Sequence, residues 1–193
     1  MEIPLPPPEK LIFVHRQPNG VAYVIINRPK SLNSLTRSMM GDLAKAIKSL
    51  DSDNSVRVII LSGSGRAFCS GVDLTAAEDV FKGDVKNVET DPVAQMERCV
   101  GADLVFSICI REAQLFAYCS CMRNEKITWP SRAREVSLTA MAVTAEQAER
   151  WGLVNHVVEG SELLKKARQI AEAIIKNNED LVLRKGLTSI MRG

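Results

Sequence analysis

The apolar positions of the first forty residues predict two strands joined by a tight turn. Residues 11–14 and 21–26 are short runs of aliphatic and β-branched side chains, which is typical of strands. Asn19 and Gly20 lie between them, and an Asn-Gly pair suits a turn that needs positive φ. We therefore expect a β-hairpin at this end of the chain.

The next segment changes from strand to helical periodicity and back again. Residues 36–50 have apolar side chains at helical spacing, and Thr36 occupies the expected N-cap position. Residues 56–61 are a β-branched run that is typical of a buried strand. A helix between two neighbouring strands makes a crossover connection, so the pattern predicts a β-β-α-β order.

Regular patterns return near the end of the chain. Residues 133–141 predict a short helix, and Thr144 begins a capping box for another helix that Gly152 ends. Residues 154–158 predict a short strand. Ser161 is then expected to cap a last amphipathic helix.

The block at 83–131 shows neither period clearly. Its apolar residues neither alternate nor form a helical stripe, so no elements are assigned to it. Four of the five cysteines fall here, but Cys119 and Cys121 do not have the spacing of a metal site and no histidine lies near them. We expect no bound metal.

Composition limits the classes of function. A length of 193 residues with 46% hydrophobic content fits one well-buried domain. The formal net charge of +2 comes from dispersed charges, so neither a nucleic-acid nor a membrane partner is indicated. No apolar run approaches the roughly 18 residues of a membrane span. Five cysteines without a secretory leader favour a reducing compartment.

The strand at 56–61 leads into a small-residue loop that includes Cys69, Ser70 and Gly71. Such a loop lets an anion approach backbone N–H groups, and a thioester oxygen that becomes an enolate is one such anion. The loop is thus a candidate oxyanion hole. The alternative is an ordinary Gly-rich connection from a strand to a helix.

Three segments, in this order, resemble the enoyl-CoA hydratase/isomerase (crotonase) family, and within it the plant peroxisomal-type members. They are residues 27–35 (NRPKSLNSL), 65–74 (GRAFCSGVDL) and 133–154. The resemblance implies an α/β fold of the ClpP/crotonase type, a spiral of β-β-α units, which is incomplete here. We expect a leader at 1–10, a single domain at 11–183 and a tail at 184–193.

The resemblance also implies a reaction: hydration of a 2-enoyl-CoA in fatty acid β-oxidation. The N–H of Val72 would be one of two donors to the thioester oxygen. Lys30 would contact a CoA phosphate, or else be an ordinary surface lysine. The backbone around Val72 would line the CoA pocket, which comprises Ser70, Gly71, Val72, Asp73 and Leu74.

One part of the family pattern is missing. Family members have a second Gly-rich segment followed by a glutamate that activates water, and neither is visible here. The central block contains Glu89, Glu97, Glu112 and Glu125 without such a surrounding, so the acid/base glutamate is unassigned. Altered splicing or a shifted reading frame is our hypothesis for this block. The alternatives are a catalytically inactive CoA-binding or subunit-like variant, and a product that does not fold stably.

The remaining expectations concern partners and location. The resemblance implies an acyl-CoA substrate, no further cofactor, and a homotrimer or hexamer that the short C-terminal region does not favour. It also implies a peroxisome, although the chain ends without a targeting tripeptide, which leaves the cytoplasm as an alternative. His15 and His156 lack a triad-like context and are expected to be structural or surface residues.

Overall fold

A computed structural model describes the following residues: 3–73, 75, 91, 135, 138–139 and 141–177, with the backbone of strands at 105–110, 114–116 and 186–190.

The first unit of the fold is a β-β-α-β segment. β1 (Ile12–Arg16) pairs antiparallel with β2 (Val21–Ile26), and their turn passes through Gly20 at a φ of 84°. α1 (Arg37–Asp51) then crosses one face of the sheet, so that β3 (Val58–Gly63) runs parallel to β2. The predicted hairpin and crossover are both confirmed.

α1 begins where the sequence predicts. The side chain of Thr36 accepts a hydrogen bond from the Met39 N–H at 3.3 Å, which satisfies one of the free N–H groups of the first helical turn. The apolar residues at helical spacing are buried: Met39, Met40, Leu43, Ile47 and Leu50. Burying each such side chain stabilises the fold by about 1.5–3 kcal/mol relative to exposure.

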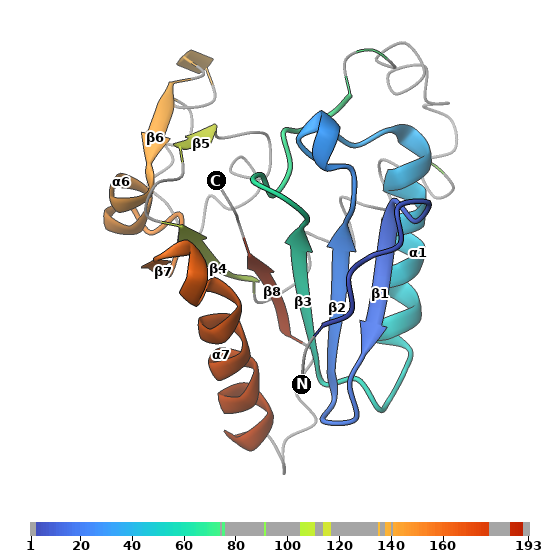
Figure 1. The fold of residues 1–193 in the computed structure, drawn as a ribbon. Helices are drawn as coiled ribbons and strands as arrows, with labels where there is room; N and C mark the ends of the chain where they lie inside the picture. Colours follow the sequence, from blue (N-terminus) through green and yellow to red (C-terminus); the bar gives the residue numbers. More distant parts are fainter. Residues whose placement is uncertain are drawn as a thin grey trace.

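Helices cover both faces of the central strands (Figure 1). In β2, Ala22, Val24 and Ile26 belong to the apolar core beneath α1. The intervening side chains of β2 pack against α7 (Leu163–Asn177) on the other face. β2 is therefore a continuous apolar run, because successive side chains enter two different cores.

The main sheet has six strands in the order β1-β2-β3-β8-β4-β7. β8 (Gly186–Ile190) lies between β3 and β4 (Val105–Ile110), parallel to both. β7 (His156–Val158) pairs parallel with β4 at the edge.

Two expectations differ from this arrangement. Residues 186–190, expected in a tail at 184–193, form β8 at the centre of the sheet. The block at 83–131, to which no element was assigned, contains β4 and also β5 (Gln114–Phe116). Both differences have the same cause: these strands are paired with segments distant in sequence, which local periodicity does not report.

A smaller unit follows the central block. β5 pairs antiparallel with β6 (Ala142–Thr144), and α6 (Ala145–Arg150) begins at once with the predicted capping box of Thr144 and Gln147. The predicted helix at 133–141 lies mostly outside the described residues.

The start of α7 differs from the prediction. Ser161 lies within a 3-10 turn, η3 (Gly160–Glu162), which has no side-chain cap, and α7 begins at Leu163. The apolar face of α7 is as predicted, since Ala167 and Ala171 are buried against the sheet.

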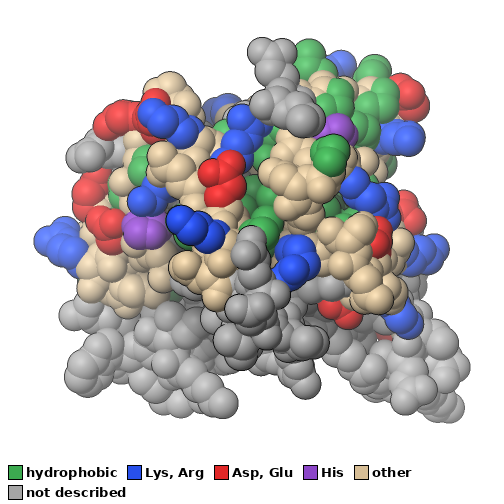
Figure 2. All heavy atoms as spheres, turned by 90° about the horizontal axis from the view of Figure 1, so that it is seen from below, with side chains coloured by type: hydrophobic (Ala, Val, Ile, Leu, Met, Phe, Trp, Pro, Cys, Tyr) green, Lys and Arg blue, Asp and Glu red, His purple; other side chains and the backbone are tan. Residues whose placement is uncertain are grey.

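The charges of the chain are dispersed over the face seen in Figure 2, where acidic and basic side chains alternate without a block of one sign. No helix among the described residues is long and apolar enough to cross a membrane.

Candidate active site

The candidate site lies at the carboxyl ends of β2 and β3, uppermost in Figure 1. After β2 the chain forms the 3-10 turn η1 (Pro29–Ser31) and reaches α1; after β3 it forms the loop at 64–73. Because β2 and β3 are parallel, both connections leave the sheet at the same edge. Ligands of α/β sheets bind at this kind of edge.

Asn33 joins the two connections. Its side chain accepts a hydrogen bond from the Arg28 N–H at 2.8 Å and donates to the carbonyls of Ser64 at 2.9 Å and Ala67 at 2.6 Å. Asn33 is fully buried. Three partly buried backbone groups thus depend on one amide, which fixes the loop after β3 against the segment after β2.

The backbone beneath this contact is strained. Leu32 and Asn33 are consecutive residues with positive φ, at 50° and 58°. Asparagine tolerates this conformation, but for leucine it costs about 1–2 kcal/mol. Such strain persists only where surrounding contacts determine the conformation, and it is concentrated at functional sites.

Glycine at position 63 allows the two connections to approach each other. A Cβ there would lie 2.3 Å from the Phe68 carbonyl oxygen and 2.5 Å from that of Ala67. Both atoms are backbone, so a side chain at Gly63 would force the loop away from the sheet.

A single-residue parallel bridge between Leu35 and Val72 then determines how the loop presents its backbone. The Leu35 N–H donates to the Gly71 carbonyl at 2.8 Å, and the Leu35 carbonyl accepts from the Asp73 N–H at 2.9 Å. The bridge uses the groups on either side of Val72. The Val72 N–H is directed away from Leu35 by the alternation of a parallel ladder.

The neighbouring N–H groups of the loop are also used. Ser70 donates to the Leu32 carbonyl at 3.0 Å, and Gly71 donates to the Cys69 Sγ at 3.3 Å. Within the described ranges, the Val72 N–H has no acceptor. An N–H without an acceptor at a ligand-binding edge can donate to a developing oxyanion.

The residue that follows Val72 takes part in an ion pair. The Arg28 guanidinium donates to the carboxylate of Asp73, and Asp73 is 6% exposed. The other carboxylate oxygen of Asp73 accepts from the Thr75 N–H at 3.0 Å and the Thr75 hydroxyl at 2.7 Å. The hydrogen bonds from Thr75 and then those from Arg28 lower the pKa of Asp73 from 3.8 to about 2. Asp73 is therefore ionised at neutral pH.

Cys69 helps to shape the loop and is not a nucleophile in this geometry. Its side chain is partly buried against the apolar core beneath α1, and its sulfur accepts the Gly71 N–H. Burial raises the pKa of the Cys69 thiol, which disfavours the thiolate. Cys69 is therefore a small packing residue of this loop.

The other candidates have distinct positions. Lys30 is exposed in η1, and Ser70 is exposed in the loop after β3, at the same edge of the sheet. Leu74 and the four central glutamates lie outside the described residues. His15 lies in β1 with its ring 6.4 Å from that of Tyr23, away from the candidate site.

Sequence reasoning gave no role to Arg28, Asn33 or Leu35. All three lie in the segment at 27–35 that was recognised as family-like. An Arg before a Pro and an Asn after a leucine have no distinctive local pattern, and their partners are in another segment. An asparagine in a short connection was the one available signal, because asparagine is enriched at positive φ.

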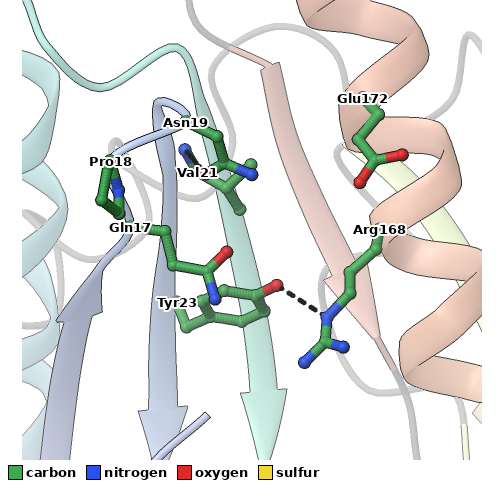
Figure 3. Close-up of a pocket in the computed structure, with 7 residues that line it drawn as sticks. All are labelled: Gln17, Pro18, Asn19, Val21, Tyr23, Arg168 and Glu172. Carbon is green, nitrogen blue, oxygen red and sulfur yellow. Dashed lines mark hydrogen bonds between the residues drawn. The ribbon is translucent and has the colours of Figure 1, made fainter. Parts of the chain in front are cut away.

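A pocket of about 300 Å³ lies at the opposite end of β2 (Figure 3). It is formed by the hairpin turn and α7, and Arg168 Nε donates to the hydroxyl of the buried Tyr23 at 3.1 Å. In the described structure, Gln17 Nε2 is buried without a partner. The hydrogen bond between Arg168 and Tyr23 attaches α7 to the sheet, and the pocket is separate from the candidate site.

No cluster of metal-binding side chains occurs among the residues described.

Comparison with known proteins identifies the family. The model of the enoyl-CoA hydratase/isomerase family matches residues 16–96 and 116–191. The unmatched interval at 97–115 lies within the central block to which the sequence assigned no element. Both the Asn33 segment and the loop at 64–73 lie inside the matched ranges.

Curated relatives agree with this match. The chain is 52% identical to "Probable enoyl-CoA hydratase 1, peroxisomal" of Arabidopsis thaliana over 205 aligned positions, covering 91% of this chain and 77% of that protein. Since 205 positions exceed the 193 residues present, that relative has residues without a counterpart here. The chain is also 28% identical to the short-chain-enoyl-CoA hydratase of Clostridium acetobutylicum, covering 81% of this chain and 72% of that protein.

Solved structures show the same fold. The enoyl-CoA hydratase EchA1 of Mycobacterium marinum aligns with a TM-score of 0.68 and 27% identity, over 86% of this chain and 76% of that one. An enoyl-CoA hydratase of Mycobacterium smegmatis gives a TM-score of 0.72 at 24% identity, over 86% and 77% of the two chains. The predicted crotonase-type fold, incomplete in this chain, is confirmed. The chain belongs to the enoyl-CoA hydratase/isomerase family.

Proposed function

We propose that this chain is an enoyl-CoA hydratase that holds the substrate's thioester oxygen with the Val72 N–H. The observation that carries the proposal is the pattern of N–H groups at 70–73, in which only Val72 lacks an acceptor in the described structure. Membership of the family supplies the reaction class.

The reaction adds water across the C2–C3 double bond of a 2-enoyl-CoA. Hydroxyl joins C3, the double-bond electrons move onto the thioester oxygen as an enolate, and a proton then joins C2. Negative charge on that oxygen grows as the C3–O bond forms. A fixed N–H donor therefore stabilises the transition state more than the ground state, which is the condition for a higher kcat.

Two functional groups remain to be assigned. Hydration needs a carboxylate that takes a proton from water and a second donor to the thioester oxygen. The glutamates at 89, 97, 112 and 125 lie outside the described residues, so we assign none of them to the role.

We further propose that Lys30 and the loop at 70–74 hold the CoA part of the substrate. Lys30 is exposed at the same sheet edge as Val72, where its ammonium can approach a phosphate. Lys30→Ala is expected to raise KM about threefold, as for a solvent-exposed charge pair, and to leave kcat unchanged. Steady-state kinetics against enoyl-CoA concentration measures both constants.

The relatives do not favour the alternative of a non-catalytic CoA-binding variant. Proteins named as enoyl-CoA hydratases match most of the chain, including the loop with Val72.

The direct test follows the loss of conjugated-thioester absorbance when the full chain is mixed with a short 2-enoyl-CoA. Val72→Pro removes the proposed donor, and we expect its kcat to fall by about a hundredfold or more. Folding of both proteins is checked by cooperative thermal unfolding. A folded wild-type chain without turnover, or equal rates for both, would contradict the proposal.

We infer from the peroxisomal Arabidopsis relative that the chain acts in peroxisomal fatty acid β-oxidation, without an added cofactor. Trimer or hexamer formation, implied by the family, is tested by light scattering of the purified chain.

A further inference from the structure

We propose that the Arg28–Asp73 ion pair is a positioning device that fixes the direction of the Val72 N–H. This inference rests on the proposed function, because it assigns residues that prepare the oxyanion donor. The contact with CoA proposed for Asp73 is through its backbone, and Arg28 is placed in no substrate contact, so the two side chains act through the backbone of Val72.

The first step concerns the two strands of the bridge. Leu35 holds the loop through the Gly71 carbonyl and the Asp73 N–H, one on each side of Val72. A single-residue bridge has only these two hydrogen bonds. The Ser70–Leu32 hydrogen bond and the bonds of Asn33 hold the loop before Val72, so the side after Val72 needs a further restraint to prevent rotation of the Val72 peptide plane.

The Arg28 side chain supplies that restraint by contacting both strands. Its Nη1 donates to the Ser34 carbonyl at 3.2 Å and to the Ser34 hydroxyl at 3.0 Å, and also to the carboxylate of Asp73. Ser34 precedes Leu35, and Asp73 follows Val72. One guanidinium therefore holds the chain on each side of the bridge, a role suited to its several rigidly oriented donors.

The second carboxylate oxygen is restrained separately. Thr75 donates its N–H and its hydroxyl to the other oxygen of Asp73, so the carboxylate is held at both ends. The Asp73 side chain is 8% exposed and that of Arg28 is 28% exposed. Burial limits exchange with water, and the pair is more rigid than an ion pair at the surface.

Asp73 is unsuited to acid/base catalysis. Thr75 and Arg28 together lower the pKa of Asp73 to about 2, so it does not take up a proton at neutral pH. Its carboxylate oxygens are already occupied by donors. The remaining role is to position the loop.

The chain contains a matched control. Asp53 has the same arrangement: its carboxylate accepts from the Ser55 N–H at 2.9 Å and the Ser55 hydroxyl at 2.6 Å, and pairs with Arg16 at 3.4 Å. This pair lies beyond α1 at the amino end of β3, so Asp53→Asn removes a similar ion pair far from Val72.

The experiment compares Asp73→Asn, Arg28→Lys and Asp53→Asn in the full chain. Turnover of a short 2-enoyl-CoA gives kcat and KM. Infrared difference spectra of bound butyryl-CoA, labelled with 13C at the carbonyl, give a second readout, because hydrogen bonding lowers the C=O stretching frequency.

We expect kcat of Asp73→Asn and Arg28→Lys to fall about tenfold to a hundredfold, with KM within about twofold of wild type. The C=O frequency of the bound thioester should return toward its value in free butyryl-CoA. Asp53→Asn should match wild type in both readouts. A general loss of structure would instead weaken binding and broaden unfolding.

The outcomes are distinguishable. Wild-type kcat and an unchanged C=O frequency in folded Asp73→Asn would overturn the positioning role. A wild type that lowers the C=O frequency but has no turnover would defeat the hydratase proposal alone, and the infrared readout would still decide the positioning role. If Asp73→Asn shows no cooperative unfolding, the positioning role is tested with Arg28→Lys and Thr75→Ala, using the same measurements of kcat, KM and C=O frequency.

Discussion

The two ends of the parallel strands β2 and β3 contain the same ion-pair arrangement in different surroundings. At the amino end, Asp53 accepts from Ser55 and pairs with Arg16, and its side chain is 32% exposed. At the carboxyl end, Asp73 accepts from Thr75 and pairs with Arg28, and its side chain is 8% exposed. The local chemistry is the same, but the degree of burial and the neighbouring backbone differ.

The difference in burial and neighbouring backbone distinguishes an ion pair in an ordinary connection from an ion pair in a candidate site. The amino-end pair joins the end of β1 to the turn between α1 and β3. The carboxyl-end pair lies behind an N–H that has no acceptor among described residues, next to two consecutive residues with positive φ. Among the residues that the structure describes, only the second end combines non-glycine residues at positive φ, a buried ion pair and a backbone N–H without an acceptor, although the buried Gln17 Nε2 at the first end also lacks a partner. An Asp-Arg pair is therefore informative about function only through the backbone that it restrains.

The largest expected effect comes from adding a methyl group at each end. In Gly63→Ala the Cβ would meet two carbonyl oxygens within 2.5 Å, so we expect a loss of about 3 kcal/mol in the free energy of unfolding. In Gly20→Ala the Cβ meets the flexible Arg57 side chain at 3.0 Å and the cost is mainly that of positive φ, about 1–2 kcal/mol. Denaturant unfolding measures both, and equal losses would contradict the contrast.

The second effect concerns two asparagines. Asn33→Ala leaves three partly buried backbone groups without this partner, and we expect a loss of about 2–3 kcal/mol. Asn19→Ala removes only one contact, the hydrogen bond that its side chain accepts from the Val21 N–H at 3.2 Å, and should cost less than about 1 kcal/mol. Thermal unfolding of the two variants gives the difference, and a larger loss for Asn19→Ala would disprove our ranking.

A third effect appears only in acid. The pKa of Asp73 is about 2 in the folded chain and 3.8 ordinarily, so the unfolded chain takes up the proton first as pH falls. The stability from the ionised carboxylate is thus fully present above about pH 4 and is lost as pH falls toward 2. Melting temperatures measured across this range should decline less steeply for Asp73→Asn than for wild type. Parallel curves would show that the contacts of Asp73 do not lower its pKa.

The smallest effect is expected at the pocket beside α7. Tyr23→Phe removes the acceptor for Arg168 Nε, and we expect a loss of about 1 kcal/mol because one hydrogen bond is lost while the ring remains packed. Its kcat should equal that of wild type. A fall in kcat with unchanged stability would show that the amino end of β2 also affects catalysis, and it would contradict the view that only the carboxyl end does.

Much of the framework could be predicted from sequence. The hairpin around Gly20, the capped helix α1 and the capping box at Thr144 all depend on residues within a few positions of one another. Local propensity and periodicity are sufficient for such elements. The sequence also indicates the loop with Val72 as a candidate site, because small residues follow a buried strand, and its role stays a prediction.

The rest depends on contacts between distant segments. β8 pairs with β3, although more than a hundred residues separate the two strands in the sequence. Arg28 and Asp73 are 45 positions apart, and neither has a local pattern that names its partner. The sequence could not predict which N–H groups at 70–73 have acceptors, because those acceptors include the carbonyls of Leu32 and Leu35 in the other connection. Contacts between distant segments satisfy the neighbouring N–H groups but not the Val72 N–H, and the local sequence pattern does not indicate this.

The most direct test of the account measures hydration by wild type, Asp53→Asn and Asp73→Asn in one assay with 18O-labelled water. We predict that wild type and Asp53→Asn form the 3-hydroxyacyl-CoA with one labelled oxygen at equal rates, and that folded Asp73→Asn forms it about tenfold to a hundredfold more slowly. Equal rates for the two variants, or a product without labelled oxygen from the wild-type chain, would contradict the account.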